Sequence, residues 1–455
     1  MQVFKSLLVD VSPLRESAAF RRLWIGSTLS SIGGALTWFA VPLQVYDLTR
    51  SPLAVGLVGL AQMVPTLTIG LLGGSVADAV DRRKLVLIVS SALAVVAAGL
   101  TAQAFAGLGQ LWLLYLLVVI SSGLLAISAP ARQTFIPRLL TPGKLPAGMA
   151  LNRLTFQIML TAGPALAGLI AATPHLGLGG CYLIDTLSFG ASLYGVARLP
   201  AMPPVSANTS SAVSGRPSGY RTAAGKTRPG PRAVVEGVRY IGRSPVLAGA
   251  FLADLNATVF GLPTALFPAI NAQRFGGDPR TLGLFLTAIG VGGLVSVCFS
   301  GPIKHVSRQG RAMLIAVAIW GAAFAGFAVV PGLWLTLGLL AIAGAADTFT
   351  VVFRGTIVQT TTPDAFRGRV TAADYVVGAG GGQLGNLEAG ALGSLTSPVI
   401  SAVTGGVVTV AGALVIWLAL PAFVRYRFKA GRADEGGLDG QEPESAEAAP
   451  TPAPA

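Results

Sequence analysis

The sequence predicts an all-α membrane protein with twelve transmembrane helices in two six-helix pseudo-repeats. Three observations lead to this prediction: an apolar composition, long uncharged stretches that recur along the chain, and similarities between its two halves. Apolar residues make up 53% of the 455 residues and charged residues only 11%, which is typical of chains that lie in lipid. Continuous apolar runs favour helices over a membrane barrel, whose strands alternate apolar and polar residues.

Twelve stretches are long enough to cross a bilayer, which requires about 20 apolar residues per helix. Their expected bounds are residues 20–46, 53–76, 85–106, 110–131, 146–172, 176–198, 245–271, 281–302, 312–331, 333–354, 370–396 and 398–424. An even number of crossings returns the chain to its starting side, so both termini are expected on one side of the membrane.

The basic residues lie almost entirely in alternate loops. If the amino terminus is cytoplasmic, only three of the 32 Lys and Arg residues lie on the opposite side, namely Arg50, Arg274 and Arg280. This asymmetry predicts a multi-pass protein of the bacterial cell (inner) membrane with both termini in the cytoplasm. The formal charge of +13 therefore reflects membrane topology, and no nucleic-acid partner is expected.

The same topology predicts five parts of the chain. They are a cytoplasmic segment (1–19), a six-helix bundle (20–199), a cytoplasmic linker (200–244), a second six-helix bundle (245–424) and a disordered cytoplasmic tail (425–455). The linker is rich in Pro, Ser, Gly and Ala, and the tail in Gly, Ala, Pro and Glu, which is typical of segments without a core. The end of the linker, residues 233–243, is predicted to form an amphipathic helix on the membrane surface.

Neither a cofactor nor a metal is expected. Cys181 and Cys298 fall in predicted spans of different halves, which argues against a disulfide scaffold and a thiolate metal site. His175 and His305 stand in loops without a pattern of partner ligands. We expect no cleavable signal peptide, because residues 1–19 carry charges instead of an uninterrupted apolar stretch.

The two halves resemble each other where loops meet helices. Residues 132–142 and 354–363 share an Arg-x-Thr sequence followed by Thr-Pro. Two six-helix repeats related by an axis along the membrane normal are a known transporter plan, with the substrate held between them near the bilayer midplane.

Several segments resemble those of the major facilitator superfamily. Residues 74–84, Gly-Ser-Val-Ala-Asp-Ala-Val-Asp-Arg-Arg-Lys, are similar to its signature loop between spans two and three, although Ala79 replaces a basic residue and Asp81 a glycine. Gly-Pro-Ala-Leu-Ala-Gly at 163–168 is similar to a loosened antiporter motif. Residues 126–139, 185–189 and 362–370 are similar to segments of the bacterial exporter branch. Within this branch, residues 20–21 and 40–44 resemble the enterobactin exporter group most.

The resemblance implies the major facilitator fold of the drug:proton antiporter type and a role for each motif. Spans one, four, seven and ten would line a central cavity. A cytoplasmic gate would join Asp78 to the start of span eleven, to Arg367 and Arg369, or to Arg82. The gate and motif residues are Gly74, Asp78, Arg82, Arg83, Arg132, Arg367 and Arg369. Close helix packing would involve Gly163, Pro164 and Gly168.

Four carboxyl groups are predicted deep in the membrane: Asp185, Asp254, Asp347 and Glu388. An ionised carboxyl at this depth is unfavourable unless it is paired or faces a wet cavity. We expect no Lys or Arg at comparable depth, which leaves protonation as the alternative. Asp254 and Asp347 are therefore the first candidates for proton carriers and Glu388 the third.

Each of these carboxyls could instead make a structural hydrogen bond to a neighbouring helix. For Asp185 this interpretation is favoured, because span six packs outside the cavity in the resembling family. Asp374 is expected near the cytoplasmic end, in a surface or gate pair with Arg367 or Arg369. The candidate polar and aromatic groups of the cavity, each of which could also pack between helices, are Gln44, Gln62, Trp38, Asn256, Phe260 and Gln383.

Together these features predict a monomeric, proton-coupled exporter of a siderophore or an amphiphilic drug, which is not an enzyme and works by alternating access. A proton-coupled uptake symporter and a non-transporting membrane sensor or scaffold are the alternatives. The partners expected are the small-molecule substrate, protons and the lipid bilayer.

Overall fold

The computed structural model describes residues 10–200, 202, 231–298 and 306–427, with the backbone alone at residues 71–79, 231 and 298. Every regular element within these ranges is a helix. The long helices are α3 (Ala18–Thr49), α4 (Pro52–Ala79), α5 (Arg82–Phe105), α6 (Leu111–Gln133), α8 (Leu145–Ala171), α9 (Gly177–Ala197), α11 (Pro245–Phe260), α13 (Pro279–Cys298), α14 (Gln309–Val329), α15 (Leu333–Thr361), α16 (Asp364–Leu395) and α17 (Pro398–Ala419).

Shorter helices connect or cap the long ones. They are α2 (Ser12–Glu16), α7 (Phe135–Leu139), α10 (Pro231–Arg243), α12 (Phe267–Arg274), α18 (Pro421–Val424) and the 3₁₀ turns η1 (Pro142–Lys144) and η2 (Thr264–Leu266). Most of the predicted tail and most of the predicted linker lie outside the described residues.

Within the described ranges, nine segments are long and apolar enough to cross a membrane. Three further long helices, α3, α9 and α16, lie where the sequence predicts spans but do not meet the same apolar criterion. The all-helical membrane fold is thus confirmed, whereas the count of twelve spans rests for these three helices on their length and position.

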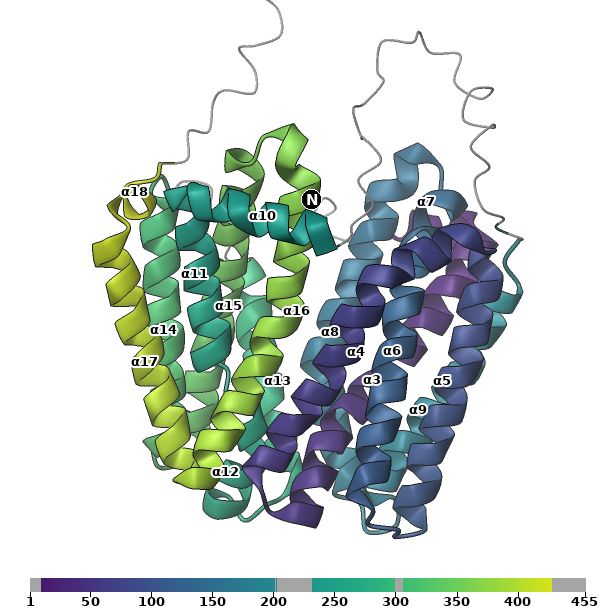
Figure 1. Cartoon of the computed structure of the whole chain (residues 1–455). Coiled ribbons are helices and arrows are strands. Elements are labelled where there is room, and N and C mark those ends of the chain that lie inside the picture. Colours follow the sequence, from purple (N-terminus) through teal and green to yellow (C-terminus); the bar gives the residue numbers. More distant parts are fainter. Residues whose placement is uncertain (1–9, 201, 203–230, 299–305, 428–455) are drawn as a thin grey trace, which may run out of the picture.

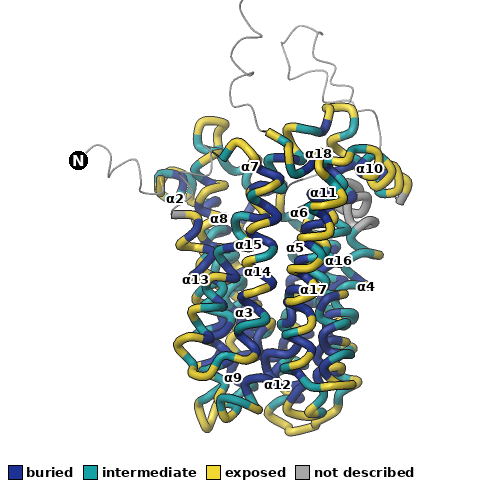
Figure 2. The backbone as a smooth tube through the Cα atoms, turned by 90° about the vertical axis from the view of Figure 1, so that its left-hand side faces the viewer, coloured by how far each residue is buried: buried dark blue, intermediate teal, exposed yellow. Residues whose placement is uncertain are grey.

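Large apolar side chains cover the outside of the bundle. Figure 2 shows exposed residues along the outer surface of the helices, and Val95, Leu187 and Leu418 are 72%, 68% and 71% exposed. So much apolar surface is unfavourable in water and suits contact with acyl chains.

The helices form two groups that stand side by side (Figure 1). One group contains the helices from α3 to α9 and the other those from α10 to α18, and their ribbons diverge towards the end of the molecule that carries α10. We call this end the α10 end and the opposite one the α12 end. The groups meet mainly through two helix pairs, α4 with α16 and α8 with α13.

Glycines permit close backbone contact between the groups near the α12 end. A Cβ added to Gly56 would lie 2.5 Å from the carbonyl oxygen of Asn386, and one added to Gly168 would lie 2.6 Å from that of Pro279. Small residues at such crossings allow membrane helices to approach without a larger side chain between them.

The predicted seventh span, residues 245–271, is interrupted in the structure. Helix α11 ends at Phe260, and η2 and α12 continue the chain after a short break. Pro263 lacks an N–H group and restricts the residue before it, so a helix is not readily continued here. Asn386 on α16 compensates, because its Oδ1 accepts hydrogen bonds from the Ala265 N–H (3.0 Å) and the Thr264 hydroxyl (2.6 Å).

Candidate functional site

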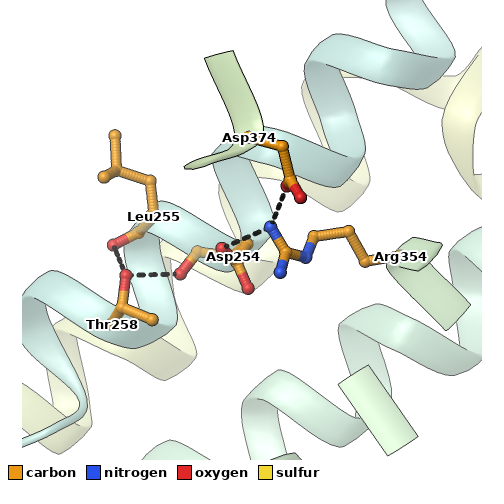
Figure 3. Close-up of polar contacts among 5 residues, drawn as sticks. All are labelled: Asp254, Leu255, Thr258, Arg354 and Asp374. Atoms are coloured by element: carbon orange, nitrogen blue, oxygen red, sulfur yellow. Dashed lines mark hydrogen bonds and ion pairs between the residues drawn. The ribbon is translucent and has the colours of Figure 1, made fainter. Parts of the chain in front are cut away.

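An ion-pair cluster joins α11, α15 and α16. The Nη1 atom of Arg354 lies 3.3 Å from Oδ2 of Asp254 and 2.5 Å from Oδ1 of Asp374, so one guanidinium lies between two carboxylates that come from different helices (Figure 3). We call Asp254, Arg354 and Asp374 the charge cluster.

The charge cluster is largely removed from solvent. The side chains of Asp254 and Arg354 are 7% and 15% exposed, and that of Asp374 is 38% exposed. Asp254 follows the start of α11 by nine residues and Asp374 follows the start of α16 by ten, which at 1.5 Å per residue places both about 14–15 Å from the α10 end of their helices.

Asp347 adds a further carboxyl to this region. It lies on α15, two turns before Arg354, and interacts electrostatically with both Asp254 and Arg354. Its side chain is exposed, and it makes no hydrogen bond or ion pair among the residues that the structure describes. The region therefore holds three acidic groups around one basic group.

The expectation that no basic side chain accompanies Asp254 is wrong. It depended on ending the tenth span at residue 354, whereas α15 continues to Thr361. Arg354 therefore lies about 10 Å inside the helix, since seven residues follow it at 1.5 Å each.

The expected partners of Asp374 are wrong for a related reason. Helix α16 begins at Asp364, six residues before the predicted span, which moves Asp374 away from the helix end and towards Arg354. Arg367 pairs instead with Asp364 (2.9 Å), and Arg369 pairs with Glu236 of α10 (2.9 Å).

The remaining two deep carboxyls stand apart from the cluster. Asp185 on α9 is buried, and its Oδ2 accepts a hydrogen bond of 2.6 Å from the hydroxyl of Thr37 on α3, the kind of interhelical bond that the structural interpretation requires. Glu388 on α16 is half-buried and makes no hydrogen bond or ion pair within the described part of the chain.

A partly open pocket lies between the two helix groups near the α12 end, and the empty space in it, open solvent included, is about 580 Å³. Of the six predicted cavity residues, Trp38, Gln62 and Gln383 line it. None of its lining side chains is ionisable; the other twelve are Phe39, Pro42, Val55, Val58, Gly59, Thr264, Ala265, Phe267, Pro268, Leu282, Leu286 and Asn386.

A chain of amides crosses this pocket from one helix group to the other. Gln383 on α16 donates from Nε2 to Oε1 of Gln62 on α4 (3.2 Å), and Asn386 donates from Nδ2 to Oε1 of Gln383 (3.5 Å). Asn386 was missed by the sequence analysis, although its position three residues after Gln383, on the same helix face, was a signal for it.

The other predicted cavity residues lie elsewhere. Gln44 is buried in a network in which Gln103 and Gln44 exchange two hydrogen bonds (3.2 and 3.0 Å) and the Tyr182 hydroxyl donates to Gln44 (2.8 Å). Asn256 donates to the carbonyl oxygen of Thr409 (2.8 Å), and Phe260 ends α11 outside the pocket. For Gln44 and Asn256 these contacts are those of the packing alternative.

Comparison with known proteins places this arrangement in a family. Residues 9–434 match the transmembrane secretion effector family, which spans nearly all of the helical region described above. The chain belongs to this family. The match confirms the resemblance to the major facilitator superfamily that the motifs predicted.

One curated relative and two solved structures are also transporters. The chain is 26% identical over 429 residues to the enterobactin exporter EntS of Citrobacter koseri, covering 93% of this chain and 97% of the relative. In fold it is similar to a bacterial homologue of the human lysosomal transporter Spinster (TM-score 0.68, 15% identity, 92% and 100% of the chains covered). The nucleoside transporter NupG is also similar (TM-score 0.63, 16% identity, 90% and 99% covered).

For two signature residues of this transporter, Gly74 and Asp78, the structure describes the backbone alone. Of the other predicted motif residues, Arg83 donates to the carbonyl oxygen of Ala197 (2.5 Å) and Arg132 to the hydroxyl of Ser90 (2.8 Å), while Arg82 contributes its N–H to the carbonyl oxygen of Met202 (3.2 Å).

Asp81, which replaces a glycine of the signature, has a local role. Its Oδ1 accepts from the Lys84 N–H (3.0 Å) and caps α5, and its Oδ2 accepts from the Met202 N–H (3.1 Å). The carboxylate therefore fixes the beginning of the linker against the start of α5.

The antiporter-like motif lies where α8 crosses α13. A Cβ on Gly283 would lie 2.6 Å from the carbonyl oxygen of Pro164 and 3.3 Å from Cα of Gly168. On the other side of α8, a Cβ on Gly163 would lie 2.7 Å from that of Ala35. The motif thus lies at a crossing between the helix groups.

Proposed function

We propose that this transporter is a proton-coupled exporter of a small molecule in the bacterial inner membrane, with both termini in the cytoplasm. The similarity to enterobactin exporters over 93% of the chain supports export. The observation that carries proton coupling is the charge cluster, in which Arg354 contacts Asp254 and Asp374 at once.

The balance of charge in the cluster favours proton exchange. One guanidinium can neutralise one carboxylate, so the second carboxylate, together with Asp347, leaves excess negative charge beside Asp254 and Arg354, whose side chains are only 7% and 15% exposed. Uncompensated buried charge is strongly unfavourable, and uptake of a proton removes it without a cation. A structural ion pair would need one carboxylate only.

Protonation in the cluster would also change helix contacts. Arg354 holds α11 and α16 to α15, because its two carboxylate partners come from those helices. When either carboxyl takes a proton, its bond to Arg354 loses its ionic component, and the helix that carries this carboxyl becomes free to separate from α15. A proton entering along the membrane potential supplies about 2.3 kcal/mol per 100 mV.

The pocket supports a neutral or weakly charged substrate with rings. Trp38, Phe39 and Phe267 offer aromatic faces, while Gln62, Gln383 and Asn386 offer hydrogen bonds. Occupation of the pocket by a polar ligand would compete with the amide chain that joins the two helix groups. This lining suits a siderophore or an amphiphilic drug, and alternating access would expose it to each side in turn.

Transport in inside-out vesicles tests coupling and direction together. We expect a fluorescent amphiphilic dye or a catecholate siderophore to accumulate when the lumen is acid. In Asp347→Asn and Asp374→Asn, accumulation driven by the pH gradient should fall about 5- to 150-fold, the range of a coupling free energy of about 1–3 kcal/mol, while exchange of labelled for unlabelled substrate continues. Asp185→Asn, which lies outside the cluster, serves as the control and should keep its coupling.

Other outcomes would favour the alternatives. Accumulation in right-side-out vesicles with an acid exterior would identify a symporter, and the absence of exchange for every probe would favour a sensor or scaffold. Unchanged gradient-driven accumulation in Asp254→Asn, Asp347→Asn and Asp374→Asn would show that the cluster does not carry the proton.

A further inference from the structure

Helix α10 lies across the second helix group at the α10 end and is fixed to α16. Figure 1 shows it crossing the bundle at the α10 end. Its Glu236 pairs with Arg369 (2.9 Å), and its Tyr240 stacks on Phe366 with ring centres 4.4 Å apart. Gly237 permits this contact, since a Cβ there would overlap the carbonyl oxygen of Arg369.

The opposite face of α10 is basic and apolar. Arg232, Val235, Arg239 and Arg243 follow one another at intervals of three or four residues, which places them along one stripe of the helix. All four are exposed, Val235 at 61%, and the neighbouring Val238 is 53% exposed. We call these five residues the α10 stripe.

The α10 stripe is positively charged without local compensation. The acidic residue of α10, Glu236, already pairs with Arg369 on α16, and the three stripe arginines have no ion pair among the described residues. Exposed valines between arginines are unfavourable in water, whereas at a membrane surface they enter the boundary between headgroups and acyl chains.

We propose that the α10 stripe is a binding surface for anionic phospholipid, which holds the first turns of α16 at the membrane surface. The protein spans a bilayer, so headgroups surround the end of the bundle where α10 lies. Three arginines match the charge of lipid phosphates, and each basic side chain near an anionic membrane contributes about fivefold to affinity. The Glu236–Arg369 pair and the Tyr240–Phe366 stack connect this surface to α16.

A fluorescent label on α10 in lipid nanodiscs tests the proposal. The label is attached to Val238→Cys in full-length protein that also carries Cys181→Ala and Cys298→Ala. Nanodiscs contain phosphatidylcholine with a minority of phosphatidylglycerol, and bromine, which quenches the label, is placed on one lipid or the other. We expect brominated phosphatidylglycerol to quench severalfold more than its mole share predicts.

Substitutions of the stripe arginines test whether they cause the excess quenching. Arg232→Gln, Arg239→Gln and Arg243→Gln together should reduce quenching to the mole share, while the three Arg→Lys changes should preserve the excess. A control with Arg308→Gln, Arg425→Gln and Arg427→Gln removes the same charge from exposed positions at the same end and should also preserve it. Quenching equal to the mole share in labelled protein that keeps all three stripe arginines would overturn the proposal, as would a label that neither lipid quenches.

Two further results would assign the stripe to another ligand. Loss of the excess on adding inorganic phosphate at constant ionic strength would identify a site for the free anion. Loss on adding an acidic soluble protein would identify a protein-docking surface. Either result would contradict a lipid site, for which only the lipid composition should matter.

Discussion

At the residue scale, the two sites differ in the kind of polar group that each contains. The charge cluster has ionisable groups and lies towards the α10 end, whereas the pocket has amides and aromatic rings and lies near the α12 end. In the proposed function, proton exchange and substrate binding therefore occupy different places, so that neither ligand has to displace the other directly.

Arg354 is expected to stabilise the fold because of Asp254. Arg354→Gln would leave a carboxylate that is 7% exposed without its cation, and removing one partner of a buried pair costs about 3–5 kcal/mol. The thermal midpoint in detergent should therefore fall. Adding Asp254→Asn removes the unpaired charge and should recover much of the loss; a double variant no more stable than the single one would contradict this account.

At the element scale, helix ends decided which parts of the site could be predicted. Apolar runs located every long helix, because burial in lipid imposes a length that composition reveals. The ends of α15 and α16 contain Thr, Arg and Asp, so the apolar signal fades before the helix does. Arg354 and Asp374 fell in these ends, and the charge cluster could not be recognised.

The amide chain was partly predictable. Gln62 and Gln383 were named as candidate cavity groups, but Asn386 depends on the break after α11, where it satisfies the backbone at Ala265. Sequence alone does not show which of two neighbouring helices such an amide approaches. For the same reason, Gln44 and Asn256 were equally plausible as cavity groups and as packing groups.

The crossing of α8 and α13 should control opening at the α12 end. In Gly168→Val the new side chain would meet the carbonyl oxygen of Pro279 and force the helices apart. We expect faster modification of Val58→Cys, which lines the pocket, by a membrane-impermeant maleimide. Gly34→Val is the matched control, because a Cβ there has no atom within 4 Å; equal labelling rates in both would refute the role of the crossing.

At the scale of the whole molecule, the closed contacts lie at the α12 end. Besides the glycines, Ser394 at the end of α16 accepts a hydrogen bond from the Leu53 N–H (2.9 Å), and its hydroxyl lies 3.5 Å from that of Ser51. Transport by alternating access requires these contacts to break once per cycle.

A disulfide at this contact should stop transport reversibly. Ser51→Cys with Ser394→Cys, in a chain with Cys181→Ala and Cys298→Ala, places the two sulfur atoms in reach of a bond. Oxidation is expected to abolish substrate exchange in vesicles, and reduction to restore it. A variant that carries only one of the two new cysteines should remain active under oxidation. Full activity of the crosslinked protein would show that the α12 end need not open.

Helix α16 contributes Asp374 to the charge cluster and Gln383 to the pocket, and the segment between them is rich in glycine. Between Asp374 and Gln383 stand Gly378, Gly380, Gly381 and Gly382, and each glycine lowers helix stability by about 1 kcal/mol relative to alanine. Bending α16 therefore costs least midway along its length. The part of α16 before these glycines, which contacts α10, can therefore tilt relative to the part after them, which lines the pocket. A small tilt of the first part need not tilt the second part by the same angle.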